Sequence, residues 1–184
     1  VHVPKVLYSW RKSHLSTSSN SSGKVKSYAF RNQKKVLKED LLDRKINGEV
    51  IKTQYRGLWR VSYELTEKPL VSIIIPTKDN LFFIKNCVRS ILENTSYKNF
   101  EILIIDTGST NSKVHNYYES LKEYAFIKIF NLNFLFNFSS VCNFGAKKAL
   151  GKYLIFLNND TQVVTKKWIE NMLEHAQRKE IGAV

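Results

Sequence analysis

The sequence predicts an α/β fold with a mainly parallel sheet and flanking helices, preceded by a small helix-plus-hairpin segment. The first indication is that, from residue 70 onward, short β-branched and aromatic runs alternate with stretches whose apolar residues recur at helical spacing. The second is that strands alternating with helices are joined by right-handed crossovers, which make neighbouring strands parallel. Before residue 67 the order differs, because one helical stretch precedes two short strand-like runs.

Residues 1–66 are expected to form a linker or appendage. Residues 1–10 are mixed apolar, and we expect them to be the tail of an upstream domain. Residues 13–23 are rich in serine, which is typical of a flexible connector.

The remainder of the appendage has regular patterns. Residues 27–45 predict a helix, because their apolar side chains can lie on one side. Residues 49–53 and 58–65 predict two strands, with Tyr55, Arg56 and Gly57 turning the chain between them. No residue pattern in this segment indicates chemistry, so its expected role is structural.

Residues 67–184 are expected to form the main domain. Its first strand is predicted at residues 71–75, a β-branched run that Pro76 would stop. Asn80 can cap the next helix, because an asparagine side chain accepts a hydrogen bond from an early helical N–H. Residues 100–105 then predict the second strand.

The alternation continues through the middle of this domain. Asn111 can start a second helix, and residues 126–130 predict a third strand. Residues 139–150 predict a third helix. We expect Gly151 to terminate it, because glycine tolerates the left-handed conformation of a helix C-cap.

The last elements follow the same order. Residues 153–157 are an unbroken apolar run, which indicates a fourth strand buried on both faces. Thr165 can cap a fourth helix, and residues 181–184 are expected to begin a fifth strand.

Positive charge is concentrated in the first part of the chain. The formal net charge is +13, and residues 1–70 carry +9 of it. Such a surface could attract nucleic acid, an anionic membrane surface or phosphorylated substrates. Because no stacking aromatics interleave with these lysines, we expect no nucleic-acid partner, whereas peripheral association with a membrane stays open.

Cysteine and histidine usage argues against a disulfide framework or a zinc site. The two cysteines, Cys87 and Cys142, form no CxxC pair, and the four histidines are scattered. A reducing cytoplasm therefore fits the chain best, with the inner face of the membrane as an alternative location. No apolar run approaches the length of a membrane span, and no signal peptide opens the sequence.

Polar residues follow three of the predicted strands, at residues 76–79, 106–110 and 158–160. In a parallel sheet these loops meet at one edge, which is where ligands bind in open α/β sheets. Carboxylate and amide oxygens there could hold Mg²⁺ or Mn²⁺, and such a site suits a diphosphate ligand. The alternative is three ordinary turns, because Asn and Asp favour turns for local reasons.

Other reaction classes lack their motifs. No phosphate-binding glycine loop follows the first strand, which argues against P-loop enzymes and dinucleotide-binding dehydrogenases. Ser109 lies in Gly-Ser-Thr rather than in a nucleophile elbow, and Cys142 is expected to pack within its helix.

Residues 69–184 resemble the family 2 glycosyltransferases, which have the A-type nucleotide-diphospho-sugar transferase fold. Four blocks in the family's order and spacing carry the resemblance: Val71-Ser-Ile-Ile-Ile-Pro-Thr-Lys-Asp, Glu101-Ile-Leu-Ile-Ile-Asp-Thr-Gly-Ser-Thr, Asn137-Phe-Ser-Ser-Val-Cys-Asn-Phe-Gly-Ala and Gly151-Lys-Tyr-Leu-Ile-Phe-Leu-Asn-Asn-Asp-Thr. Each block alone is weak, and together they are specific.

The resemblance implies a set of donor-binding residues. The residues implied in nucleotide-sugar binding are Pro76, Thr77, Asp79, Asp106, Gly108, Asn143, Asn158 and Asn159. Pro76 and Thr77 would line the base and ribose, Asp106 would recognise the base, and Asp160 would hold a divalent metal on the diphosphate. The chain departs from the family pattern at Asn158, which replaces the first acid of the Asp-x-Asp motif, and at Thr107, where Asp or Asn is common.

The resemblance also implies an inverting transfer from a nucleotide-diphospho-sugar donor to a glycan or lipid-linked glycan acceptor. The expected setting is synthesis of cell-surface polysaccharide or O-antigen-type glycan. A carboxylate base must reach the acceptor hydroxyl, and in the family it lies after the fifth strand, so we expect it beyond Val184. On this hypothesis the chain is the donor-binding half of a longer multi-domain enzyme and is inactive alone.

Two other hypotheses remain. One is a non-catalytic sugar-nucleotide-binding or scaffolding module, which the replacement at Asn158 would allow. The other is a receiver-like switch with Asp106 as the phosphoacceptor. That hypothesis ranks far behind, because it needs a cluster of acids after the first strand.

Overall fold

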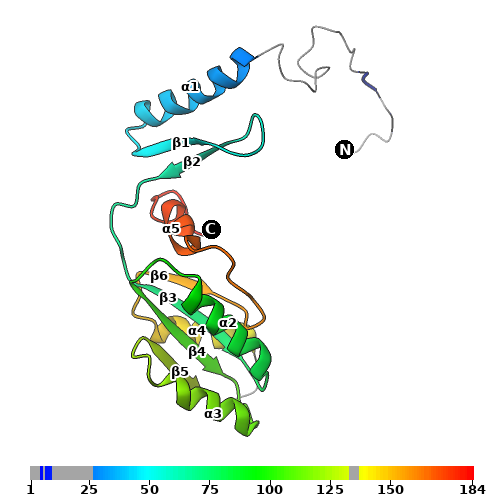
Figure 1. Cartoon of the computed structure of the whole chain (residues 1–184), viewed down its shortest axis with the longest axis vertical. Coiled ribbons are helices and arrows are strands. Elements are labelled where there is room, and N and C mark those ends of the chain that lie inside the picture. The colour runs from blue at the N-terminus through cyan, green and yellow to red at the C-terminus, as the bar shows by residue number, and fades with distance from the viewer. Residues whose placement is uncertain (1–4, 6, 10–26, 133–136) are drawn as a thin grey trace. The chain divides into compact units, whose positions relative to one another are not determined.

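The computed structural model describes residues 5, 7–9, 27–132 and 137–184 (Figure 1). The chain divides into two compact units, Val1–Glu64 and Leu65–Val184. The expected Ser-rich connector lies outside the described residues, as does most of the expected upstream tail. No helix in the described part of the chain is long and apolar enough to span a bilayer.

The first unit contains one helix and one hairpin, as the sequence predicts. Helix α1 spans Ser27–Asp43, and strands β1 (Gly48–Lys52) and β2 (Trp59–Tyr63) pair antiparallel. The small core of this unit includes Leu41 of α1 and Val50 of β1, both buried.

The second unit is built on a parallel four-stranded sheet, which confirms the predicted fold class. The strands are β3 (Val71–Thr77), β4 (Phe100–Asp106), β5 (Ile127–Asn131) and β6 (Tyr153–Phe156), in the order β5-β4-β3-β6. The chain moves outward from β3 through β4 to β5 and then returns to the other side of β3 to form β6. The topological switch therefore lies between β3 and β6.

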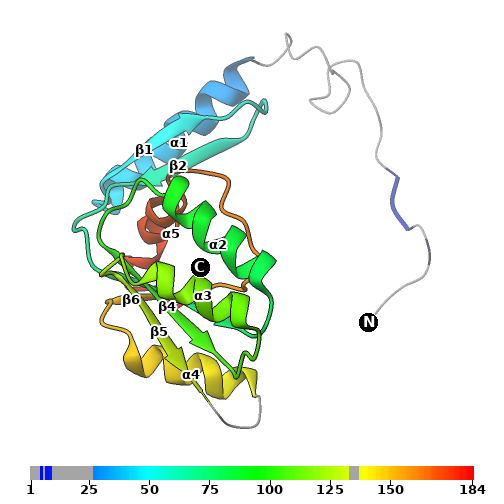
Figure 2. The same ribbon diagram turned by 60° about the horizontal axis from the view of Figure 1, so that its bottom comes forward.

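Helices cover both faces of this sheet, as Figure 2 shows. The helices are α2 (Leu81–Glu93), α3 (Ser112–Leu121), α4 (Phe138–Lys148) and α5 (Trp168–Ala176). Residues of α2, α3 and α5 belong to one apolar cluster, and α4 packs on the opposite face. Asn80 and Asn111 cap α2 and α3 as predicted, each accepting a backbone N–H.

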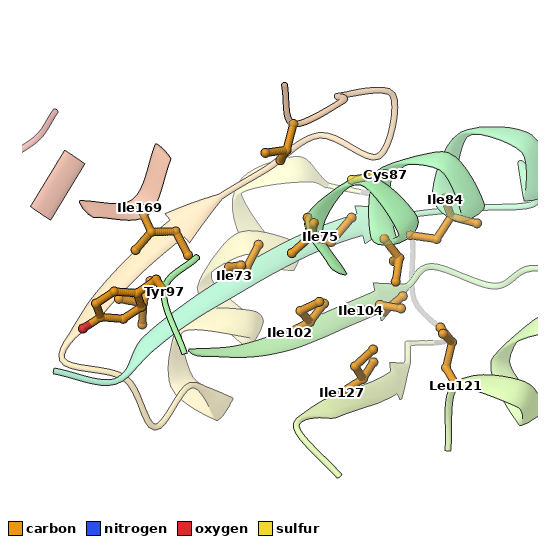
Figure 3. Packing of buried hydrophobic residues seen from close by; sticks show 14 of the residues in the cluster. Ile73, Ile75, Ile84, Cys87, Tyr97, Ile102, Ile104, Leu121, Ile127 and Ile169 are labelled. Atoms are coloured by element: carbon orange, nitrogen blue, oxygen red, sulfur yellow. The ribbon is translucent and has the colours of Figure 1, made fainter. Parts of the chain in front are cut away.

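Alternate residues of β3 and β4 point to opposite faces, and because helices cover both faces, all residues of the two strands except Pro76 and Phe100 are buried. On one face, the side chains of Ile73, Ile75, Ile102 and Ile104 pack with Ile84 (Figure 3). On the other, Ile74, Leu103 and Ile105 pack against Val141 of α4. Each such isoleucine or leucine contributes roughly 1.5–3 kcal/mol through burial, so this double core holds the strand ends in place.

Strand β3 continues through Pro76, so the prediction that Pro76 stops it is wrong. Pro76 pairs in register with Ile105 of β4, whereas β6 pairs with β3 only as far as Ile74. Successive residues of a strand direct their backbone groups to opposite sides, and Thr77 directs its carbonyl to Thr107 on the β4 side. The nitrogen of Pro76, which carries no hydrogen, therefore faces the side where β6 has already ended. The proline thus removes no hydrogen bond between strands.

Gly151 does not terminate α4, so the prediction that this glycine ends the helix is wrong. The helix ends at Lys148, and its C-cap residue is Ala149 in an extended conformation. A Cβ on Gly151 would lie 2.6 Å from both the backbone nitrogen and the hydroxyl of Ser72. Gly151 is thus required for close approach to β3 rather than for a left-handed cap.

Strand β6 is not buried on both faces. Leu154 is 39% exposed and Phe156 is 52% exposed, whereas Tyr153 and Ile155 pack against the core. The reason is position, because β3 is the one strand that pairs with β6 among the described residues. An apolar run alone does not distinguish a central strand from an edge strand.

Two further predictions at the C-terminal end are wrong. Helix α5 begins at Trp168, and its N-cap residue is Lys167, without a side-chain cap; Thr165 lies before it. Residues 181–184 form no strand in the structure.

A buried carboxylate, that of Glu101, organises the amino-terminal ends of the strands, opposite to the ends that carry the polar loops. Glu101 accepts hydrogen bonds from the Ser72 hydroxyl at 2.7 Å, the Leu150 N–H at 2.7 Å and the Lys128 ammonium at 2.9 Å. The Ser72 hydroxyl in turn accepts the N–H of Gly151 at 2.8 Å. This network fixes the turn between α4 and β6, and thereby the register of β6.

Candidate functional site

A cleft of about 450 Å³ lies at the carboxyl ends of β3 and β6, the switch point of the sheet. The residues that line it are Pro76, Thr77, Lys78, Thr107, Phe138, Asn158, Asn159 and Asp160. They come from the end of β3, from the loops after β3, β4 and β6, and from the start of α4. Ligands of open α/β sheets bind at this place, because the diverging loops leave a crevice there.

Thr77 joins the three loops. Its hydroxyl accepts a hydrogen bond from Nδ2 of Asn159 at 2.9 Å. Its carbonyl accepts the backbone N–H of Thr107 at 3.0 Å and the Thr107 hydroxyl at 3.2 Å. These bonds close one side of the cleft and set the positions of the loops after β4 and β6.

The Asn158–Asp160 segment forms a turn that also faces the cleft. Leu157 N–H donates to Ile74 O at 2.9 Å, and the chain then turns with Thr161 N–H bonded to Asn158 O at 3.2 Å. The side chains of Asn158 and Asp160 are exposed and line the cleft. The turn and the site are therefore compatible interpretations of this segment.

The thiol of Cys87 lies beneath this turn and contacts Asn158 O at 3.7 Å. Burial, together with the negative charge of Asp160, raises the pKa of Cys87 to about 12. The thiol therefore stays protonated at neutral pH and is no candidate nucleophile.

Asp106 does not line the cleft. Its side chain is 1% exposed, and its Oδ1 accepts the N–H groups of Gly108 at 2.8 Å and Ser109 at 2.7 Å. Its Oδ2 accepts the hydroxyl of Tyr118 at 2.6 Å, and burial together with this hydrogen bond raises the pKa of Tyr118. Both carboxylate oxygens are thus engaged within the protein, and the neighbouring Thr107 lies in the cleft instead.

Asp79 likewise organises a loop. Its backbone has a positive φ of 51°, and its Oδ1 accepts the N–H groups of Thr110 at 2.6 Å and Asn111 at 2.9 Å. These backbone hydrogen bonds lower the pKa of Asp79. Asp79 therefore ties the loop after β3 to the start of α3, and it is absent from the cleft lining described above.

Two predicted residues lie apart from the cleft lining. Gly108 has a φ of 92°, which a side chain would strain, and it donates to Asp106 rather than lining the cleft. Asn143 is exposed on α4. The structure thus brings together Pro76, Thr77, Asn158, Asn159 and Asp160 from the predicted set.

Three lining residues were absent from the predicted set: Lys78, Thr107 and Phe138. Lys78 is the only basic residue among the described residues of the lining. It directly follows Thr77, so its position after the first strand was the available signal. Phe138 is the first residue of α4, half exposed, and no pattern in the sequence distinguishes it from a core aromatic.

The lining fits a divalent cation that is shared with a ligand. The described residues contain no group of three or more His, Cys, Asp or Glu side chains that could enclose a metal ion. Asp160 supplies a carboxylate and Asn158 an amide oxygen at the cleft. Mg²⁺ is often held by one or two carboxylates with substrate phosphates completing its shell, so this donor set suits a cation that arrives with a diphosphate.

An open parallel sheet with helices on both faces and a polar cleft at its switch point defines a doubly wound α/β domain. Residues 72–184 match the family model for glycosyl transferase family 2. This match covers more than half of the chain, and the chain therefore belongs to glycosyl transferase family 2.

Two curated relatives match the whole chain. An O-antigen biosynthesis protein of Myxococcus xanthus is 32% identical over 186 residues, and an uncharacterized protein of Sinorhizobium fredii is 31% identical over 191 residues. The chain spans 14% and 20% of the lengths of these proteins, respectively.

Solved structures show the same fold. A mannosyltransferase from Pyrobaculum calidifontis, in complex with GDP-Man and Mn²⁺, has a TM-score of 0.57 at 17% identity, over 85% of this chain and 43% of that one. Staphylococcus aureus TarS (residues 1–349) has a TM-score of 0.50 at 20% identity, over 58% of this chain and 32% of that one.

Proposed function

We propose that residues 67–184 are the donor-binding half of an inverting glycosyltransferase that uses a nucleotide-diphospho-sugar. The single observation that carries the proposal is the cleft at the switch point of the sheet, which Thr77, Asn158 and Asp160 line together. Family membership and the GDP-Man and Mn²⁺ of the mannosyltransferase support it. The O-antigen relative supports a role in cell-surface polysaccharide synthesis. The proposal includes a glycan or lipid-linked glycan as acceptor, in the cytoplasm or at the inner membrane face.

Pro76 and Thr77 would contact the base and ribose of the donor, because both line the cleft at the end of β3. Asp106 would position the loop after β4 rather than recognise the base, because its two oxygens accept hydrogen bonds from Gly108, Ser109 and Tyr118. Thr107, adjacent to it and facing the cleft, would take the contact with the nucleotide. Asp79 and Gly108 would act in the same indirect way.

Asp160 and Asn158 would hold a divalent cation, Mn²⁺ or Mg²⁺, on the diphosphate. When bound, the cation would neutralise the charge that develops on the leaving diphosphate. Asn158 contributes no charge, so the field for a cation is weaker than with two carboxylates. Lys78 adds a positive charge within the same cleft. This charge would not help to hold the cation, but it would pair directly with the phosphates of the donor.

An inverting transfer also requires a base that accepts the proton of the acceptor hydroxyl. Asp160 is the only carboxylate among the described lining residues, and it is committed to the cation in this proposal. We therefore assign the base to a part of the longer protein beyond Val184. Residues 1–66 would serve as a linker or appendage to this donor-binding half.

The test is a titration of UDP-, GDP- and dTDP-sugars, with and without Mn²⁺, by calorimetry. We expect one nucleotide class to bind, and Mn²⁺ to strengthen the binding. Asp160→Asn should abolish the effect of Mn²⁺, whereas Glu119→Gln, which alters an exposed carboxylate on α3, should leave it unchanged. Absence of metal-dependent nucleotide binding, by this chain and by a version extended past Val184, would overturn the proposal.

A non-catalytic donor-binding module is the second candidate, and Asn158 favours it because it leaves one carboxylate for the cation. A version extended past Val184 distinguishes the two. Release of nucleotide with transfer of sugar to a glycan acceptor supports the enzyme. Donor binding without any turnover supports the module.

A further inference from the structure

A second and larger cleft, of about 740 Å³, lies within the first unit. It is formed by α1 and the hairpin of β1 and β2. The residues that line it are Phe30, Arg31, Lys34, Lys35, Lys38, Glu39, Lys52, Gln54, Arg56, Gly57, Leu58 and Trp59. The donor cleft and the family assignment leave this site unexplained, because the family match begins at residue 72.

The floor of this cleft is apolar and well packed. Gly57 turns the hairpin with a φ of 80°, and an added Cβ there would lie 2.8 Å from the Phe30 ring. Phe30 of α1 therefore rests directly on the turn. Trp59 of β2 donates from Nε1 to the side chain of Gln33 at 3.4 Å, which ties the second aromatic residue to the same helix.

The walls of the cleft are cationic. Arg31, Lys34, Lys35 and Lys38 recur at three- and four-residue spacing, which places them along one side of α1. Lys52 and Arg56 add two more positive charges from the hairpin.

Acidic side chains are few among the described residues that line the cleft. Glu39 is the only acid among the described lining residues, and it lies 3.6 Å from Lys35 in an exposed ion pair. A concave surface with this excess of positive charge attracts anions, and its field is strongest at low salt.

Apolar side chains are exposed beside these cations. Tyr55 and Leu58 flank the hairpin turn and are 63% and 59% exposed, respectively. A basic surface that also presents an aromatic and an aliphatic side chain matches a membrane interface, where cations meet phosphate groups and apolar tips enter the headgroup region.

The aromatic rings of the cleft do not favour nucleic acid. The Arg56 guanidinium lies 4.7 Å from the centre of the Phe30 ring, and the Lys34 ammonium lies 5.5 Å from that of Trp59. Each ring thus already has a cation over it. A single-strand binder needs open aromatic faces on which bases can stack.

We propose that this cleft binds the phosphate headgroups of anionic phospholipids and holds the first unit on a membrane surface. The lysines and arginines of the cleft pair with the headgroups, and Tyr55 and Leu58 enter the interface beside them. The site is separate from the donor cleft, so it stands or falls independently of the proposed transferase activity.

The test is co-sedimentation of the full chain with vesicles of phosphatidylcholine, alone or mixed with phosphatidylglycerol. We expect binding to the mixed vesicles only. The triple variant Arg31→Gln, Lys38→Gln, Lys52→Gln should weaken that binding by about tenfold or more, since each cation near the surface adds to the affinity. These three positions are exposed, and circular dichroism verifies that the variant folds.

A matched control removes the same charge elsewhere. The variant Lys113→Gln, Lys147→Gln, Lys166→Gln alters exposed positions of the second unit and should retain binding. Equal losses in both triple variants would overturn the proposal, because net charge alone would then explain binding. Leu58→Ser should weaken vesicle binding more at high salt than at low salt, because salt screens the charges and the apolar contact then dominates.

Two competitors test the identity of the ligand. Single-stranded RNA that displaces the vesicles at comparable concentration would overturn the proposal in favour of nucleic acid. Inorganic pyrophosphate that does so would favour a soluble phosphate ligand instead. Asp160→Asn should bind vesicles like the unaltered chain, which separates this site from the donor cleft.

Discussion

Asn159 donates a hydrogen bond from Nδ2 to the hydroxyl of Thr77 over 2.9 Å, and so joins the loop after β6 to the last residue of β3. The two residues are distant in the sequence and meet because β6 returns to the free side of β3. The bond fixes one wall of the cleft at the switch point. Asn158 and Asp160, on either side of Asn159, belong to the lining of that cleft.

Removing this hydrogen bond should change the geometry of the cleft more than the stability of the fold. Asn159→Ala is expected to cost about 1 kcal/mol of stability, the usual net value of one hydrogen bond. Thr77→Val should cost about as much, because it leaves the partly buried amide of Asn159 without its acceptor, just as Asn159→Ala leaves the buried Thr77 hydroxyl without its donor. Urea unfolding of both single variants and the double variant measures the coupling. Additive single effects would contradict a direct contribution of the bond.

Asp106 should matter for stability rather than only for binding. Asp106→Ala leaves two N–H groups and the Tyr118 hydroxyl without their buried partner, so we expect a loss of about 3 kcal/mol or more. Tyr118→Phe should lose less, because the two N–H groups keep their acceptor. Thermal unfolding measures both. A stable Asp106→Ala variant that no longer binds donor would instead support direct base recognition.

Gly151 should tolerate no side chain. Gly151→Ala places a Cβ 2.6 Å from Ser72, and we expect a loss of about 1–3 kcal/mol from the displaced backbone. Gly182→Ala is the matched control, since no atom lies within 4 Å of its added Cβ. Equal unfolding midpoints for the two variants would contradict a steric role for Gly151.

Glu101 should make stability depend on acid pH. Burial raises the pKa of this carboxyl, but hydrogen bonds from Ser72, Leu150 and Lys128 outweigh burial and hold the pKa below its ordinary 4.5. The ionised group therefore stabilises the fold above about pH 4.5, and this contribution is lost as pH falls through the lowered folded-state pKa.

Urea unfolding across this pH range compares the unaltered chain with Glu101→Gln. The difference in stability should be largest near neutral pH and should shrink as the pH falls through the lowered pKa of Glu101, where the unaltered carboxyl becomes protonated too. Glu93→Gln, at the exposed end of α2, serves as the control. A difference that is constant with pH would show that the charge of Glu101 is unimportant.

Local patterns were sufficient for the order of elements in the second unit. The β-branched runs at β3 and β4 and the helical spacing in α2 and α3 are properties of adjacent residues, and the asparagine caps at Asn80 and Asn111 act within one turn. Parallel pairing follows from the alternation of these elements. The meeting of three polar loops at one sheet edge was therefore predictable.

The exact roles of residues at that edge were not predictable in the same way. Asp106 and Thr107 are neighbours in a typical motif. The Asp106 carboxylate is nevertheless enclosed by Ser109 and Tyr118, whereas Thr107 lines the cleft. Successive side chains of a strand point to opposite faces, so which of these two side chains reaches the cleft depends on where the strand ends relative to α3.

The sequence by itself determined the α/β class, the positions of most helices and strands, and the candidate cleft residues Thr77, Asn158 and Asp160. Only the tertiary structure decided that Gly151 serves close packing on Ser72 and that β6 is an edge strand in the described sheet. The physical reason is the separation along the chain of the residues that each interaction joins. Backbone propensity and capping act between near neighbours, whereas steric contact, burial and hydrogen-bond satisfaction depend on residues that folding brings together from distant parts of the chain.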